Sequence, residues 1–385
     1  MYTLKRDLPR QSEARRSRSD GVTTARSDLV ALVLLAGACF ADLQTGYELS
    51  SSLFYIIPVA YAAWFTGRAR GMGVAVMSAA AWLVCQRVGG MPFSRPGILF
   101  ANAAAELAIY FGTAWTVSRV AADADLQRRL TAHANEAREA LDREFLAVGQ
   151  LQRGLLPREL PRMPGYAWEV HYATSTRAGG DYYDGFRLQD GRVGVVVADA
   201  TGHGAPAAVL MAMGRALLGA QPSAMSHPAE VLERLNQQLG RMLPPGWFLT
   251  AAYLTLDPGS GRFEYALAGH DPPLIVRARD RSVAPLEDRA GLPLGPFPDR
   301  RYVAGEELLD PGDTLVMFTD GVTETMNASN ELFGLERLRA SLASTAAADL
   351  AEVQCELLVR LDRHAGGRPR EDDTTIVLLR RLASE

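Results

Sequence analysis

Lysine is almost missing from this chain of 385 residues, in which Lys5 is the only lysine among 40 basic residues. A Walker A loop, a protein kinase and a Schiff-base enzyme each need a lysine at a defined place in the site. These three classes are therefore excluded. The motifs GxSxG and HExxH are absent too, which removes the usual signatures of serine hydrolases and zinc proteases.

Cysteine is also scarce. Cys39, Cys85 and Cys355 lie far apart, and no CxxC pair occurs. This pattern excludes a disulfide framework and a cysteine zinc site. The formal net charge is −4, whereas a general nucleic-acid binder is more often basic. We therefore expect no nucleic-acid partner.

Charge is sparse over residues 29–118, where only seven of 90 residues are charged. Apolar blocks lie near 28–46, 51–66, 71–88 and 98–118, and crossing a bilayer takes about 20 residues. The arginine-rich segment 1–27 lacks an apolar period and predicts a disordered basic tail. With that tail inside, the turn at 66–70 and the segment from Arg119 share the arginine-bearing side. We predict a four-helix transmembrane domain over 28–118. The alternative is the buried helical bundle of a soluble protein.

Residues 119–156 are predicted to form one helix. Apolar or weakly polar residues recur there at spacings of three and four: Leu126, Leu130, His133, Ala137, Leu141, Phe145 and Val148. The other faces are charged, so the stripe resembles a heptad seam with one irregular step. We predict a helical, coiled-coil linker that can pair two copies of the chain. The alternative is a surface helix packed on its own domain.

Residues 157–385 are predicted to form the last domain. Strand-like runs lie at 193–198, 248–256, 262–267, 274–277, 314–318 and 375–379. Helical stretches fit 205–220, 228–242, 333–343 and 347–364. Strands followed by pairs of helices, without regular βαβ alternation, predict an α+β layered domain.

Acidic residues in this domain stand at the ends of apolar runs, next to glycine. They are Asp181, Asp184, Asp199, Asp320, Asp372 and Asp373. Mg²⁺ and Mn²⁺ prefer carboxylate and carbonyl oxygens, and two such ions can activate a water for attack on phosphorus. A single Asp-Gly pair is ordinary turn chemistry. The ordered set instead predicts a dimetal phosphoester hydrolase.

Five motifs carry a resemblance to a known family. They are GGDYYD (179–184), ADATGHG (198–204), AGHDPP (268–273), FTDGVTE (318–324) and DDTT (372–375), with the lead-in QRGLLP (152–157). Residues 150–380 resemble the PPM, or type 2C, family of metal-dependent protein serine/threonine phosphatases. The bacterial branch typified by stage II sporulation protein E is the most similar. The resemblance implies an αββα sandwich, here preceded by the helical transmembrane domain and the helical linker.

The resemblance also implies a site. The dimetal ligands would be Asp181, Asp199, Asp320 and Asp372, joined by the backbone carbonyl of Ala200, for two divalent cations, Mn²⁺ or Mg²⁺. Asp373 is the alternative to Asp372, because spacing does not separate adjacent carboxylates. His203 would protonate the leaving serine oxygen or serve a structural role. The arginine that grips phosphate in some relatives has no clear counterpart here.

The function implied is a membrane-anchored, Mn²⁺/Mg²⁺-dependent protein serine/threonine phosphatase. Its substrate would be a phosphorylated signalling protein, typically a small anti-sigma factor antagonist. The phosphatase domain would lie in the cytoplasm at the bacterial inner membrane, controlled by the membrane domain through the linker. The first alternative is a catalytically silent pseudo-phosphatase that binds a partner. The second is a metallohydrolase of small phosphoesters.

Overall fold

The computed structural model describes residues 10–45, 51–88, 96–220, 227–287 and 291–383, and the side chains from residue 24 onward. The chain divides into two compact units, Met1–Arg138 and Glu139–Glu385. Each unit is described by itself.

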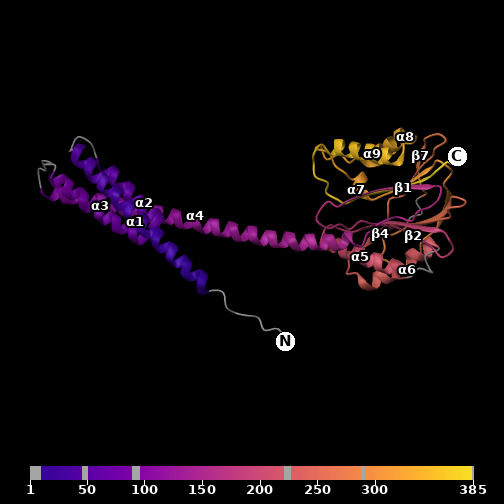
Figure 1. The fold of residues 1–385 in the computed structure, drawn as a ribbon, viewed down its shortest axis with the longest axis horizontal. Coiled ribbons are helices and arrows are strands. Elements are labelled where there is room, and N and C mark those ends of the chain that lie inside the picture. The colour runs from indigo at the N-terminus through magenta and orange to yellow at the C-terminus, as the bar shows by residue number, and fades with distance from the viewer. Residues whose placement is uncertain (1–9, 46–50, 89–95, 221–226, 288–290, 384–385) are drawn as a thin grey trace, which may run out of the picture. The chain divides into compact units, whose positions relative to one another are not determined.

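The first unit is helical (Figure 1). Its elements are α1 (Arg10–Thr45), the 3₁₀ helix η1 (Ser51–Tyr55), α2 (Ile56–Thr66), α3 (Arg68–Val88) and the first part of α4 (Pro96–Arg153). Each predicted apolar block therefore lies in a helix. Three segments are long and apolar enough to cross a bilayer: Thr24–Thr45, Arg68–Val88 and Gly97–Arg153. The fourth, Ser52–Thr66, is shorter.

Helix α1 corrects one sequence prediction. It begins at Arg10, so residues 10–27 are helical where the sequence predicts a disordered tail, and residues 1–9 lie outside the described part. Arginine, alanine, serine and glutamate are compatible with a helix, and no proline interrupts the chain between Pro9 and Pro58. The helix therefore continues from the apolar block back toward Pro9.

The core of the helical unit contains a polar centre. Tyr55 and Val59 are fully buried, and Asp42 is 3% exposed. The Tyr55 hydroxyl donates to Asp42 Oδ2 at 3.0 Å and lies 3.5 Å from Cys85 Sγ. An aspartate inside an apolar bundle is costly unless it is hydrogen-bonded, and Tyr55 supplies that partner.

Helix α4 has 58 residues and ends at Arg153. The helix predicted over 119–156 is thus confirmed as far as Arg153, and it continues the last apolar block without a break. Leu126 and Leu130 are 56% and 60% exposed. Leu141 and Phe145 are also exposed. The apolar stripe of the linker therefore faces solvent within a single copy of the chain.

The second unit is an αββα sandwich, as predicted. One sheet has the strand order β1-β10-β9-β6-β7 and the other β2-β3-β4-β5-β8, and neighbouring strands are antiparallel. The strands are β1 (Tyr166–Ala173), β2 (Tyr182–Arg187), β3 (Val193–Ala200), β4 (Leu249–Leu256), β5 (Arg262–Ala268), β6 (Leu274–Val276), β7 (Val283–Pro285), β8 (Gly305–Leu308), β9 (Thr314–Phe318) and β10 (Thr374–Arg381).

Helices cover the outer face of each sheet (Figure 1). Helices α5 (Ala205–Gly219) and α6 (Pro228–Met242) contact β3, β4 and β5. Helix α8 (Gly334–Thr345) contacts β7, and α9 (Leu350–Ala365) contacts β1 and β10. The short α7 (Asp320–Thr323) follows β9 directly.

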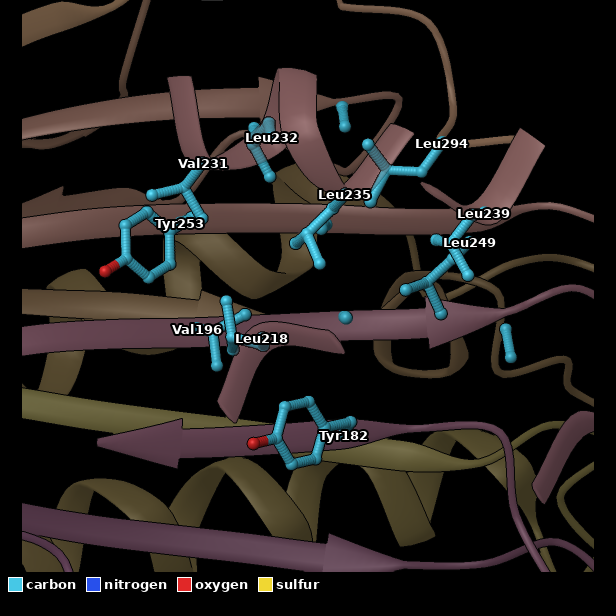
Figure 2. Close-up of a cluster of buried hydrophobic side chains, with 14 of the residues drawn as sticks. Tyr182, Val196, Leu218, Val231, Leu232, Leu235, Leu239, Leu249, Tyr253 and Leu294 are labelled. Atoms are coloured by element: carbon cyan, nitrogen blue, oxygen red, sulfur yellow. The ribbon is translucent and has the colours of Figure 1, made fainter. Parts of the chain in front are cut away.

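Three apolar layers hold this sandwich together. Figure 2 shows the layer between α5, α6 and their sheet, which contains Val196 and Leu232. Val195 and Val197 point the other way, into the layer between the two sheets. A third layer lies under α8 and α9. Alternate residues of a central strand thus enter two cores, which explains the continuous apolar run of β3.

Candidate active site

Antiparallel pairing brings the predicted aspartates to one end of the sandwich. Tyr182 pairs with Ala198 across β2 and β3, so the next positions, Asp181 and Asp199, stand opposite each other. In the other sheet Phe318 pairs with Ile376 across β9 and β10. Asp320 follows that end of β9, and Asp372 precedes β10.

These four carboxylates repel one another. Burial, followed by the charges of Asp181, Asp320 and Asp372, raises the pKa of Asp199 to about 10. Burial raises the pKa of Asp181 to about 7 and that of Asp320 to about 6, with neighbouring carboxylates adding to both shifts. Burial also raises the pKa of Asp372. A bound cation would stabilise the ionised form of these buried, mutually repelling carboxyl groups.

Two threonines orient Asp181, which is 1% exposed. Thr319 Oγ1 donates to Asp181 Oδ2 at 2.8 Å, and Thr375 Oγ1 donates to the same oxygen at 2.5 Å. The other carboxylate oxygen, Oδ1, accepts from neither threonine. Neither threonine is among the site residues predicted from the sequence, although both stand inside the FTDGVTE and DDTT motifs.

The adjacent aspartates Asp372 and Asp373 have different surroundings. Asp373 Oδ1 accepts from the Ser175 N–H at 2.8 Å, and Oδ2 accepts from the Gly180 N–H at 2.6 Å. A Cβ on Gly179 would lie 2.4 Å from Asp373 Oδ2, so glycine is required there. Asp373 therefore holds the loop before Asp181, while Asp372 acts electrostatically on Asp199 and Asp320.

The Ala200 carbonyl lies beside the same loop. A Cβ on Gly180 would stand 2.8 Å from Ala200 O, and the Ala200 N–H donates to Gly180 O at 3.3 Å. A side chain at Gly180 would therefore crowd this carbonyl.

The two histidines of the motifs differ. His203 is exposed, between Gly202 and Gly204, both of which have positive φ. It lowers the pKa of Asp372 through its charge. His270 is 7% exposed; its Nδ1 lies 2.8 Å from Thr250 Oγ1 and its Nε2 lies 3.0 Å from Phe318 O. His270 thus supports the strand that precedes Asp320.

The donor chemistry fits hard divalent cations, because it consists of carboxylates and a carbonyl, with the exposed imidazole of His203 near Asp372. In the described part of the chain, no three carboxylate, imidazole or thiol groups converge closely enough to hold one ion as they stand. A bound cation would offset the mutual repulsion of the four acids.

The end of α4 contacts the loop that carries Asp181. Gln152 Nε2 donates to the Tyr172 hydroxyl at 2.5 Å, and that hydroxyl donates to Asp181 O at 3.4 Å. A Cβ on Gly149 would lie 1.9 Å from Arg177 O. Helix and loop therefore pack backbone to backbone, next to the acidic cluster.

Comparison with known proteins agrees with this arrangement. Residues 189–382, about half of the chain, match the family model of stage II sporulation protein E (SpoIIE). The chain belongs to the SpoIIE family. This SpoIIE-family protein is 29% identical over 240 residues to the phosphoserine phosphatase RsbU of Bacillus subtilis, a match that covers 62% of this chain and 70% of RsbU.

Solved structures show the same fold. The SiaA-PP2C domain of Pseudomonas aeruginosa superposes with a TM-score of 0.58 at 24% identity, covering 63% of this chain and 98% of that domain. The RsbU and RsbW domains of Rv1364c from Mycobacterium tuberculosis give a TM-score of 0.52 at 31% identity, covering 60% and 64%. The C-terminal unit of this SpoIIE-family protein is therefore a PP2C-type protein serine/threonine phosphatase domain.

Proposed function

We propose that this chain is a membrane-anchored, divalent-cation-dependent phosphatase that removes phosphate from serine or threonine of a signalling protein. The observation that carries the proposal is the convergence of Asp181, Asp199, Asp320 and Asp372 at one end of the sandwich, with raised pKa values and no arginine or lysine among the groups that shift them. The relationship to the phosphoserine phosphatase RsbU supports the reaction class.

The four aspartates and the Ala200 carbonyl would hold two divalent ions, Mn²⁺ or Mg²⁺. When bound, such ions supply charge neutralisation for the phosphoryl oxygens and a water of lowered pKa. Thr319 and Thr375 fix Asp181 in place. Asp373 holds the loop through Ser175 and Gly180, so we assign it positioning rather than ligation.

His203 would complete the reaction on the leaving-group side. Its imidazole is exposed and close enough to Asp372 to act on it electrostatically. We propose that it delivers a proton to the serine Oγ as the P–O bond breaks. An imidazolium N–H is a suitable proton donor for general acid catalysis.

The apolar helices would anchor the enzyme in the bacterial inner membrane, with the phosphatase domain in the cytoplasm. Three helices are long enough to span, and the fourth segment, Ser52–Thr66, is shorter. If all four cross, the turn at 66–70 and the segment from Arg119 lie on the side of the arginine-rich N-terminal segment, whereas Arg87 and Arg95 flank the turn on the other side. The linker helix would carry the signal. Its contact through Gln152 and Tyr172 reaches the backbone of Asp181.

The substrate would be a small phosphorylated anti-sigma factor antagonist, as the family resemblance implies.

The test uses the full chain in phospholipid nanodiscs, with a phosphoserine protein as substrate. Phosphate release should require Mn²⁺ or Mg²⁺, stop with chelator and be lost in Asp199→Asn. Calorimetric titration of the metal should show binding that the variant loses. Substrate capture without turnover and without a need for divalent ions would instead establish the pseudo-phosphatase.

Substrate preference distinguishes the protein phosphatase from the remaining alternative, a hydrolase of small phosphoesters. A protein phosphatase should turn over a phosphoserine protein with a higher kcat/KM than free phosphoserine, which has the same leaving oxygen. A hydrolase of small phosphoesters would show the reverse order. The same enzyme preparation and the same metal are used in both assays, so incomplete metal loading affects both kcat/KM values equally.

A further inference from the structure

A pocket of about 160 Å³ opens beside the acidic cluster. Gly321 and Asp372 line it, so it adjoins the proposed metal site. Its apolar walls are Met326, Ala365 and Pro369. A cavity of about 150 Å³ accepts a group the size of benzene, so this pocket has room for one side chain.

The two arginines of the pocket are already engaged. Arg368 Nη1 donates to Asn330 Oδ1 at 2.6 Å, and its Nη2 donates to Glu371 Oε1 at 2.6 Å. Arg370 Nη2 donates to Asp362 Oδ1 at 2.8 Å. The contact with Asn330 ties the loop after α9 to the turn after α7, and each arginine is paired with a carboxylate. The pocket walls are therefore built before any substrate arrives.

Glu324 also lines the pocket, and it differs from the two arginines because its side chain is unpaired in the described part of the chain. It is exposed, and within the described ranges its side chain has no hydrogen bond and no ion pair. It is close enough to Asp320 to raise the pKa of that carboxyl. A pocket with apolar walls and an unpaired carboxylate suits a long basic side chain, whose stem packs on apolar surface while its charged end remains near water.

We propose that this pocket receives a lysine or arginine of the phosphoprotein substrate, from a position close to the phosphorylated residue. Met326 and Pro369 would contact the stem, and Glu324 would pair with the cationic end. The inference rests on the proposed phosphatase function and adds a specificity-determining residue to it. Shared lining by Asp372 places the pocket within reach of residues that flank the scissile phosphate.

The test is a set of phosphoserine peptides, otherwise uncharged, in which a single lysine or a single glutamate is moved from four residues before to four residues after the phosphoserine. The full chain in nanodiscs is assayed with Mn²⁺. At one position the lysine peptide should exceed the glutamate peptide in kcat/KM by about threefold to fivefold, the size of one exposed ion pair. Glu324→Lys should reverse that ratio, and Glu324→Gln should bring it near one.

Both peptides are assayed with the same enzyme variant, so the ratio of their kcat/KM values does not depend on any effect of the substitution on metal binding. Glu306→Lys is the matched control, because Glu306 is an exposed glutamate on β8 of the other sheet, and its ratio should equal that of the wild type. A ratio near one at every position, or one that Glu324→Lys leaves unchanged, overturns the pocket assignment alone. Failure to hydrolyse any phosphoserine peptide overturns the proposed function and this assignment together.

Discussion

At the scale of single residues, Asp199 shows how the site lowers the stability of the metal-free domain. Its pKa of about 10 lies far above the ordinary value, so at neutral pH the folded state holds a carboxyl group that resists ionisation. The unfolded chain ionises this carboxyl freely at neutral pH, so replacing it with a neutral amide should remove that penalty on folding. The residue kept for metal binding is therefore one that destabilises the metal-free domain.

We predict that Asp199→Asn stabilises the protein in chelator while it abolishes metal-dependent turnover. The gain should be about 1–2 kcal/mol, or roughly 2–8 °C in Tm for a domain of this size. Thermal unfolding with chelator and with Mn²⁺ measures it, and Mn²⁺ should raise the Tm of the wild type only. Asp299→Asn, at an exposed position, is the control. A lower Tm for Asp199→Asn in chelator would show that this carboxyl does not destabilise the metal-free domain.

Because His270 is buried, we predict that the protein loses stability in acid. Burial lowers its pKa to about 4 from an ordinary 6.5, so the unfolded state binds the proton first. Its contribution is present above pH 6.5 and is lost as pH falls toward 4, by up to about 3 kcal/mol. Denaturant unfolding at several pH values should give a shallower acid slope for His270→Gln than for the wild type. Equal slopes would show that His270 is not the group responsible.

At the scale of elements, the end of α4 is a close contact rather than a loose tether. Gly149 faces Arg177 O with no room for a Cβ. Gly149→Ala should therefore displace the loop before Asp181, destabilise the phosphatase unit by about 1–3 kcal/mol and weaken Mn²⁺ binding. Calorimetric titration and thermal unfolding measure both effects.

The same helix offers its own control for that substitution. A Cβ on Gly112 meets no atom within 4 Å, so Gly112→Ala should be neutral or slightly stabilising, as expected for alanine in a helix. If Gly149→Ala behaves like Gly112→Ala, the helix does not constrain the loop.

The stripe of the linker makes a second prediction at this scale. Leu130 and Leu141 are exposed in one copy of the chain, and an apolar seam of this spacing pairs helices. We expect a dimer, which Leu130→Glu with Leu141→Glu should convert to a monomer in light scattering of the detergent-solubilised chain. Arg138→Glu with Arg129→Glu, outside the stripe, should leave the dimer intact. A wild-type monomer at micromolar concentration would refute pairing through this helix.

At the scale of the whole molecule, the contrast between the two units predicts where the chain resides. The helical unit exposes Leu32, Val33 and Phe40, whereas the sandwich buries its large apolar side chains in three layers. An exposed apolar surface of this kind belongs in lipid. The expressed chain should stay in the membrane fraction after alkaline carbonate washing. Protease added from the cytoplasmic side should cut the phosphatase unit, and extraction by carbonate would contradict anchoring.

Much of the architecture follows from local patterns. Strands β3, β4 and β9 and helices α5 and α6 lie within one or two residues of their predicted bounds, because central strands are continuously apolar and amphipathic helices repeat every 3.6 residues. Strands β1, β2, β7 and β8 were missed. Three of them are short, all lie at sheet edges, and β1 is polar at Glu169 and His171. Strands whose pairing is decided by distant partners carry a weak local signal.

By itself the sequence determined the family, the apolar helices and the four candidate aspartates, because motif order and hydrophobic period are local properties of the chain. Only the tertiary structure distinguished Asp372 from Asp373, since the hydrogen-bond partners of Asp373 come from Ser175 and Gly180, far away in the chain. It alone brought Thr319 and Thr375 to Asp181, and Gln152 to Tyr172. Such contacts join residues far apart in the chain, and packing of the complete fold is what selects them.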